Sequence, residues 1–359
     1  MRLYNITPQE SKYITIMRAM ALILVIYLHQ YVDKIGFAGQ EVSLHRSFYL
    51  EEFEYLVSRI IVYAGVPLFY LISSVLLYSK EFTWIENMKK KSKSLILPYL
   101  LWITIYMLIY YVGQSIPMTA PFFANPSRMI TNFNVLDFIG AYTGYVGNGL
   151  FVNALWFVRD LIIFNIFAVV IKKAIDRFPV IIFLLNLLHW ILGVKLFFST
   201  VSICFFIFGY YIVKWNIHMD EIKRFSKIEL IVSYIVLIGL QFYTHYIGSD
   251  FEIGVGSISV LIGIGMLIII SKAMIDRDLR VQKLFILISQ YSFFIYASHD
   301  MIQTIYKKLF AKMLLQSELV QFIEYLLIPI MTIATCILIG MAMKRMFNKG
   351  YQALSGGRA

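Results

Sequence analysis

IMRAMALILVIYLHQY, residues 16–31, is apolar enough to lie in a membrane-crossing helix. Two ionisable side chains interrupt it, Arg18 and His29, which are eleven residues apart. At about 100° per residue, this interval places both side chains on one helix face, separated by roughly 16 Å along the axis. Such a pair is costly in a membrane unless the face lines a polar interior. The interval suggests a long anionic ligand that binds at one end and reacts at the other.

The rest of the chain repeats this apolar character. Of 359 residues, 60% are hydrophobic and only 15% are charged, which is not the composition of an ordinary soluble domain. Apolar runs of about 17–23 residues recur along the whole length. We therefore predict an all-α, polytopic membrane protein that forms a single domain over residues 1–359. The predicted spans are ten: 14–32, 59–79, 95–112, 154–171, 178–194, 197–213, 229–247, 253–271, 284–303 and 321–343.

Two features of these runs bear on the number of spans. The fifth and sixth runs are nearly fused around Lys195, so nine or eleven spans remain possible. The first run is long, and no small-residue cleavage site follows it. We therefore expect it to stay in the protein as a helix rather than to be removed as a secretory signal.

Lysine and arginine residues divide unevenly between the two sets of connections. With the N-terminus in the cytoplasm, 22 of them lie on the inner side and eight on the outer side. Because cytoplasmic loops are enriched in Lys and Arg, this predicts cytoplasmic N- and C-termini and a multi-pass protein of the cell inner or plasma membrane. The net charge of +11 then reflects topology. We expect no nucleic-acid partner, because the basic residues are spread over membrane loops.

The sequence gives no sign of a metal or a nucleotide-binding loop. Cys204 and Cys336 both fall inside predicted helices and are interpreted as small apolar side chains. No CxxC, no HExxH and no Gly-rich phosphate loop is present. We therefore predict no metal site.

The predicted topology assigns a depth to each polar residue in the spans. His29 lies near the outer end of the first span, and His299 and Asp300 lie near the outer end of the ninth. Arg159 and Asp160 fall about one to two turns below the outer surface. These groups, which are far apart in the sequence, thus have a similar predicted depth in the membrane, as a reaction centre requires. Depth alone does not place them side by side.

Five motifs follow one another along the chain. They are Arg18-x10-His29, GVPLFYLISS at 65–74, a basic stretch before LILPYLLW at 95–102, ALWFVRDL at 154–161 and SFFIYASH at 292–299. In their order and spacing they resemble the acyltransferase-3 family of integral membrane acyltransferases, over nearly the full length. Two positions depart from the family pattern: the serine-glycine pair usual after the second helix is Ser73-Ser74 here, and the basic residues before Pro98 are lysines rather than arginines.

The resemblance implies a ten-helix fold, an acyl-CoA donor taken from the cytoplasm, and transfer to a hydroxyl of a glycan or similar acceptor. It also implies that Arg18 and His29 are essential, with the histidine at the reacting centre. No tightly bound cofactor is expected beyond the donor substrate, which is most simply acetyl-CoA. The expected partners are acyl-CoA, a glycan or lipid-linked sugar, and membrane lipids.

The chemistry of the residues is consistent with that implication. Arg18 can donate in a fork to phosphate or to amide carbonyls of the pantetheine arm, and the cluster at Lys89–Lys93, with Lys91 and Lys93 as candidates, can neutralise phosphate charge. His29 can act as a general base toward an acceptor hydroxyl or can carry the acyl group transiently. We favour the general base slightly, because it needs no additional intermediate.

Several roles remain open for the other polar residues at this predicted depth. His299 is a further catalytic candidate, and Asp160 or Asp300 can orient a histidine or pair with Arg159. Because Arg159 and Asp160 are adjacent, they are expected to point about 100° apart and to need different partners.

Each signal also has a plainer interpretation. His29 can simply sit at the membrane interface, and Arg18 can snorkel to the inner surface. The Lys89–Lys93 run is more often a topology signal, and His189, His218 and His245 are interpreted as incidental. The Gly- and Tyr-rich stretch GAYTGYVGNG at 140–149, in the long connection 113–153, is either an acceptor-binding surface or a folded cap over the bundle.

We therefore predict a membrane O-acyltransferase that moves an acyl group, most simply acetyl, from cytoplasmic acyl-CoA to a hydroxyl of a cell-envelope or exported glycan. The alternatives are an exporter of a polysaccharide or lipid-linked sugar without catalytic activity, and a non-catalytic membrane scaffold. Arg18 and His29 discriminate between them, because an exporter needs a polar path but no titratable residue at those positions.

Overall fold

The computed structural model describes residues 4–32, 34–37, 40–43, 46–194, 198–218, 227–277, 279–314 and 317–357. Within them the chain is helical apart from one short hairpin and the connecting loops. Its elements are α1 Pro8–Leu28, β1 Lys34–Phe37, β2 Gln40–Ser43, α2 Phe48–Tyr55, η1 Leu56–Ile60, η2 Ile61–Ala64, α3 Gly65–Tyr78, α4 Trp84–Lys91, η3 Ser92–Ile96, α5 Leu97–Ser115, η4 Ala120–Phe123, η5 Pro126–Arg128, η6 Ile130–Asn132, α6 Val135–Thr143, η7 Asn153–Leu155, α7 Trp156–Arg177, α8 Pro179–Leu192, α9 Thr200–Lys214, α10 Lys227–Tyr246, α11 Glu252–Arg277, α12 Leu279–Gln290, α13 Ser292–Leu314, α14 Glu318–Met346 and α15 Asn348–Ser355.

The predicted class, an all-α chain with several membrane-spanning helices, is confirmed. In the described residues seven helical stretches are long and apolar enough to cross a membrane. They are Pro8–Leu28, Phe48–Tyr78, Trp84–Ser115, Asn153–Arg177, Ile228–Tyr246, Glu252–Ile275 and Glu318–Met346. The predicted fifth and sixth spans appear as two shorter apolar helices, α8 and α9. Gly193, which adopts the left-handed conformation, ends α8, while Lys195 lies outside the described residues.

The predicted ninth span, 284–303, does not correspond to a single helix. The chain breaks at Tyr291, so that α12 ends at Gln290 and α13 runs from Ser292 to Leu314. Lys307 and Lys308 are among the eight basic residues predicted on the outer side. Both lysines lie within α13, and both donate a hydrogen bond to a backbone carbonyl oxygen. An apolar helix can include a lysine whose ammonium group is hydrogen-bonded. A lysine without such a partner is more costly there and favours the end of the apolar segment.

Two helices are longer than the sequence predicted, and each contains a π-helical turn. The second runs without a break from Phe48 to Tyr78, with the π-turn η1 at Leu56–Ile60. The third begins at Trp84 and passes through the π-turn η3 at Ser92–Ile96. Polar residues in these stretches, including the lysines before Pro98, made them look like loops. Single π-turns inside α-helices are frequent at functional sites.

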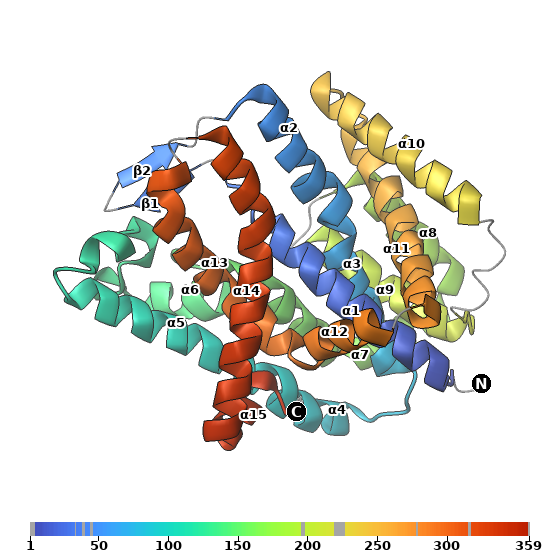
Figure 1. Cartoon of the computed structure of the whole chain (residues 1–359). Coiled ribbons are helices and arrows are strands. Elements are labelled where there is room, and N and C mark those ends of the chain that lie inside the picture. The colour runs from blue at the N-terminus through green and yellow to red at the C-terminus, as the bar shows by residue number, and fades with distance from the viewer. Residues whose placement is uncertain are drawn as a thin grey trace. The chain divides into compact units, whose positions relative to one another are not determined.

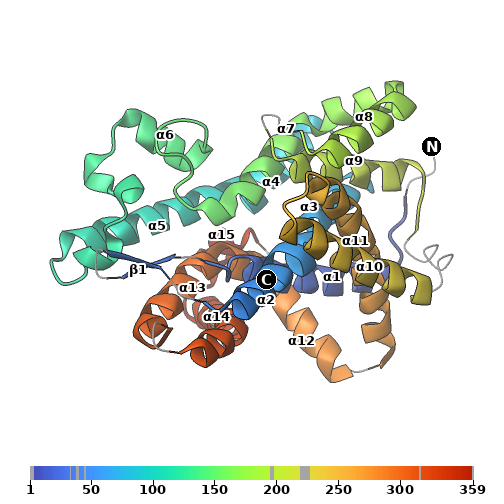
Figure 2. The same ribbon diagram turned by 90° about the horizontal axis from the view of Figure 1, so that it is seen from above.

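The chain forms two compact units. Unit 1 consists of residues 1–28, 55–88 and 163–292, and unit 2 consists of residues 29–54, 89–162 and 293–359. In unit 1, α1 packs on α3, α11 and α12, and α10 lies along α11 (Figure 1). Figure 2 shows α8 beside α9 in the same unit. In unit 2, α14 carries α15, which packs on α5.

In unit 1, α3 packs closely on α9. Ser74 is fully buried, and its hydroxyl donates to the Phe206 carbonyl oxygen over 2.6 Å. Gly209 faces it: a Cβ at this glycine would lie 2.5 Å from the Ser74 Cβ and 2.7 Å from the Leu71 carbonyl oxygen. The serine-serine pair at 73–74 therefore does not prevent close packing, because the glycine stands on the partner helix.

Two features predicted from the sequence have a clear outcome here. Cys204 and Cys336 are both buried and free, as expected for small apolar side chains.

The stretch around α6 folds as a compact cap. Asn134 and Asp137 form a reciprocal capping box, and the Asp137 carboxylate also accepts from the Asn148 backbone N–H. Gly144, Gly147 and Gly149 have positive φ, which turns this loop back on the helix.

Replacing Gly209 with leucine should destabilise the protein by about 1–3 kcal/mol, because the new side chain meets backbone and Ser74 rather than a flexible side chain. Gly239→Leu is the matched control, since nothing lies within 4 Å of a Cβ at Gly239. Thermal unfolding of the purified variants, followed by tryptophan fluorescence, should show a lower Tm for G209L only. Equal Tm values for both variants would contradict the close packing of α3 on α9.

Candidate active site

His29 and His299 meet in unit 2. His29 is the first residue of the turn that follows α1, and His299 lies two turns into α13. Their ring centroids are 5.2 Å apart, with 53° between the ring planes. The two histidines are 270 positions apart in the sequence. The structure therefore brings together the two candidates that the predicted topology placed at the same depth.

The His299 ring has a fixed orientation and a defined tautomer. Its Nδ1 lies 2.5 Å from the Tyr296 carbonyl oxygen, which can only accept, so this nitrogen carries the hydrogen. The side chain is fully buried, and its Nε2 has no hydrogen-bond partner among the described residues. The lone pair of a neutral imidazole is thus held inside the protein beside a second imidazole. The centroid of the Tyr296 ring lies 5.8 Å from that of the His299 ring.

Further polar groups surround the histidine pair. Lys307 Nζ donates to the His29 carbonyl oxygen over 2.7 Å, and Gln303 Nε2 donates to Gln30 Oε1 over 2.7 Å. These contacts tie the turn after α1 to α13 at two successive residues. Tyr106 extends the same network, with its hydroxyl 3.1 Å from the Ala297 carbonyl oxygen.

Gln303, Lys307 and Tyr106 were not predicted as site residues. A signal for the first two was available, because His299, Gln303 and Lys307 follow one another at intervals of four residues and share one face of a helix. Nothing in the sequence pointed to Tyr106, which belongs to a span rich in tyrosine.

A buried ion pair also lies in unit 2. Arg46 Nε is 3.2 Å from Glu54 Oε2, and both side chains are almost completely buried. The guanidinium also donates to the Val32 carbonyl oxygen and lies 5.4 Å from the centre of the Tyr31 ring. This pair therefore contacts the segment that follows His29, at Tyr31 and Val32.

Arg159 and Asp160 pair with each other, which is one of the alternatives left open by the sequence, and this contradicts the expectation from their adjacency that they need different partners. The Arg159 guanidinium folds back onto Asp160 Oδ1, with Nη2 at 2.7 Å and Nε at 2.9 Å. The 100° offset between adjacent helix residues was the wrong guide, because the arginine side chain is long enough to span it. Asp160 is fully buried and Arg159 is not.

The cap loop covers the exposed side of Arg159. The centre of the Tyr145 ring lies 4.6 Å from the guanidinium carbon, a cation–π contact, and Nη1 is 3.4 Å from the Thr143 carbonyl oxygen. Burial raises the pKa of the Tyr145 phenol above its usual value, and the Arg159 charge opposes that shift. The loop 140–149 therefore packs on Arg159, as the folded-cap interpretation expects, and Asp160 forms an ion pair with the same arginine.

Arg18 lies in unit 1, on α1. It is partly buried, and its Nη2 donates to the hydroxyl of Ser292 over 3.0 Å. Ser292 is the first residue of α13, the helix that carries His299. Since α1 ends at Leu28, one residue before His29, the common face of Arg18 and His29 stays a prediction.

Lys91 and Lys93 occupy the junction of α4 with the π-turn η3. Lys91 ends α4 and is partly buried, whereas Lys93 is exposed. Both belong to unit 2, whereas Arg18 belongs to unit 1. A donor site made by all three residues therefore stays a prediction. Asp300, which follows His299 in α13, is partly exposed.

Comparison with known proteins agrees with the resemblance seen in the motifs. The sequence model of the acyltransferase-3 family, described as an acyltransferase domain, matches residues 11–341 and so includes residues of both units. No curated protein and no solved structure matches the chain significantly. Because the match covers nearly the whole chain, from α1 into α14, the protein belongs to the acyltransferase-3 family and is a multi-pass membrane acyltransferase.

Proposed function

We propose that this protein transfers an acyl group, most simply acetyl, from acyl-CoA in the cytoplasm to a hydroxyl of a cell-envelope or exported glycan. The observation that carries the proposal is the His29–His299 pair, in which a buried imidazole with a fixed tautomer lies 5.2 Å from a second imidazole. The proposed setting is the inner or plasma membrane, with ten spans and both termini in the cytoplasm, as the distribution of Lys and Arg predicts.

His29 is proposed as the general base. As the acceptor oxygen attacks the thioester carbon, His29 removes the hydroxyl proton, and the C–O bond forms. The tetrahedral intermediate then collapses, the C–S bond breaks, and the coenzyme A thiolate takes the proton from the imidazolium. His299 supports this cycle, because its unprotonated Nε2 can accept a hydrogen bond from the imidazolium and stabilise it.

Arg18, Lys91 and Lys93 are proposed to bind the donor. A guanidinium has five N–H donors, and the neutral Ser292 hydroxyl takes a hydrogen bond from only one of its nitrogens. The charge of Arg18 is therefore not neutralised by this partner and can bind a phosphate or the carbonyls of the pantetheine arm. The two lysines supply additional positive charge on the predicted cytoplasmic side.

His29→Gln should lower the rate of acyl transfer by about 100-fold or more, because glutamine cannot take up the hydroxyl proton. The measurement follows free thiol release from acetyl-CoA and ester formation on envelope glycan, using purified protein. His189→Gln is the matched control, since His189 is a partly buried histidine of α8 that takes no part in the pair.

The two outcomes separate an enzyme from an exporter. Loss of both signals in H29Q, with an unchanged Tm and an active H189Q, agrees with acyl transfer. Full retention of thiol release and ester formation in H29Q rules out His29 as the base. A wild-type protein that neither binds acyl-CoA nor modifies glycan contradicts the enzyme altogether and favours export.

Arg18→Gln should raise the KM for acetyl-CoA roughly tenfold or more, because the neutral amide loses a charge-assisted hydrogen bond to the donor. Arg18→Lys should recover only part of the loss, since an ammonium cannot donate in a fork. Arg345→Gln, at the exposed end of α14, is the control for general charge loss. An unchanged KM for acetyl-CoA in R18Q, measured by initial rates, would remove Arg18 from the donor site.

A further inference from the structure

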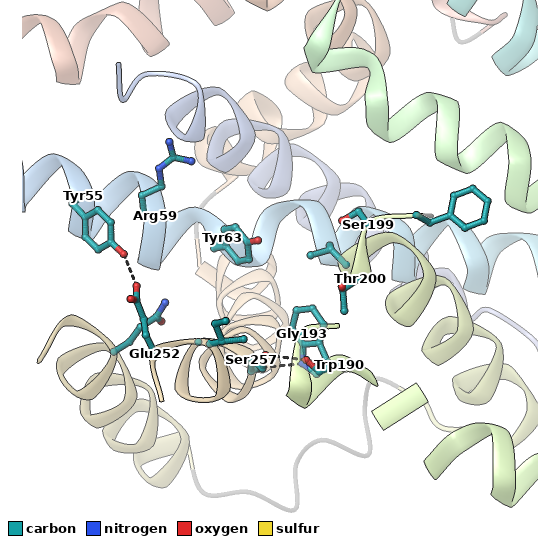
Figure 3. A pocket seen from close by; sticks show the side chains of 14 residues that line it. Tyr55, Arg59, Tyr63, Trp190, Gly193, Ser199, Thr200, Glu252 and Ser257 are labelled. Carbon is teal, nitrogen blue, oxygen red and sulfur yellow. Dashed lines mark hydrogen bonds between the residues drawn. The ribbon is translucent and has the colours of Figure 1, made fainter. Parts of the chain in front are cut away.

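Unit 1 contains a cavity of about 710 Å³ that the acyl-transfer chemistry does not use. Its walls come from the α2–η1–η2 helix and from α8, α10 and α11, together with the start of α9 (Figure 3). A volume of this size is in the range of pockets that bind small ligands. All of the residues that line it belong to unit 1.

One wall is formed by Tyr55, Arg59 and Tyr63, which follow one another at four-residue intervals along a single helix (Figure 3). The π-turn η1 lies between the two tyrosines and contains Arg59. A π-turn shifts the register of a helix, so its presence here changes which side chains face the cavity. Figure 3 shows the Tyr55 hydroxyl directed toward Glu252.

The carboxylate of Glu252 is held in place from two sides. Its Oε1 accepts from the Tyr55 hydroxyl over 2.8 Å and lies 3.2 Å from His245 Nδ1. The Tyr55 and His245 rings stack at 3.7 Å with 13° between their planes. A carboxylate, a phenol and an imidazole from three helices thus form one ordered polar group at the cavity. His245, interpreted from the sequence as incidental, is part of it.

The opposite wall is aromatic and rigid. Trp190 is buried, and its indole N–H donates to the Ser257 carbonyl oxygen over 3.1 Å. In return, the Ser257 hydroxyl donates to the Trp190 carbonyl oxygen over 3.1 Å. Gly256 precedes this serine and leaves space: a Cβ there would lie 3.0 Å from the end of the Gln241 side chain, which also lines the cavity.

This lining combines aromatic rings with planar hydrogen-bonding groups, and it carries one cation and one anion, Arg59 and Glu252. The hydrocarbon chain of a lipid could not form hydrogen bonds with these polar groups. The phosphates of coenzyme A would require a clear excess of positive charge, which one arginine beside one carboxylate does not provide. A sugar ring fits both features, because its C–H face packs on aromatic rings and its hydroxyls pair with carboxylate, amide and guanidinium groups.

The cavity is also on the predicted outer side, where an exported glycan would be found. Tyr55 and Arg59 belong to the first predicted connection or its edge, Trp190 and Gly193 to the end of the fifth predicted span, and Glu252 to the edge of the seventh connection. The distribution of Lys and Arg assigns all three of these connections to the outer side. We propose that this cavity binds a sugar unit of the acceptor glycan. The inference rests on the proposed acyl transfer.

The test compares cavity-lining and matched control variants of the full-length protein in kinetics. Gly256→Leu fills the cavity, whereas Gly254→Leu, two residues away on α11, meets nothing within 4 Å. Tyr63→Ala removes a lining ring, and Tyr243→Ala removes an exposed ring of α10 that does not line the cavity. The acceptor is envelope glycan extracted from cells that lack this protein, and the donor is acetyl-CoA.

G256L and Y63A should raise the KM for the glycan at least tenfold and leave the KM for acetyl-CoA and the Tm unchanged, with both controls like wild type. Equal glycan KM values in the lining and control variants would overturn the sugar site, as would a rise in the acetyl-CoA KM instead. A wild-type protein without any transfer would contradict the proposed function itself. Failure of the proposed function is distinguishable from failure of the sugar site, because it is seen in the wild-type protein and does not depend on the cavity variants.

Discussion

A polar side chain on a membrane-spanning helix must find its hydrogen-bond partners inside the protein, because hydrocarbon offers none. The N-terminal half of α13, which is not one of the seven candidate spans, is buried in the protein, and the same need for internal partners organises the candidate active site there. His299 Nδ1 donates to the carbonyl of Tyr296, Gln303 donates to Gln30, and Lys307 donates to the carbonyl of His29. Each bond holds α13 or the turn after α1 in position. His299 Nε2 has no hydrogen-bond partner among the described residues, and its ring lies beside that of His29, where a base needs support.

The sequence predicted the parts of this arrangement that depend on length and composition. The apolar runs predicted a multi-pass helical chain, and the depths of His29 and His299 indicated that they could meet. Prediction failed where a polar residue is paired. Lys307 and Lys308 were assigned to the outer side although they lie in α13, and the adjacency of Arg159 and Asp160 favoured different partners although the two pair with each other. A hydropathy scale takes account of the charge of a side chain. It does not take account of the partner group that lowers the free-energy cost of burying that charge.

Local backbone irregularities were equally hidden from the sequence. The π-turns η1 and η3 occur in stretches whose mixed polarity resembled loops, and each continues a helix instead of ending it. The turn η1 carries Arg59 between two tyrosines at the cavity of unit 1, and η3 carries Lys93. At the contact between α3 and α9, the absence of a side chain at Gly209 leaves the space that the Ser74 side chain occupies. One residue of the proposed acceptor site and one of the proposed donor site, Arg59 and Lys93, thus lie in irregular helical turns.

The central claim is that a donor taken from the cytoplasm reacts with an acceptor on the other side of the membrane. The most direct measurement uses the protein reconstituted in sealed vesicles of known orientation, with envelope glycan enclosed and labelled acetyl-CoA added outside. The account predicts label on the enclosed glycan only in vesicles whose outward face carries the chain termini and the Lys89–Lys93 cluster. Label that appears equally in both orientations, or only when donor and glycan share one compartment, would contradict it.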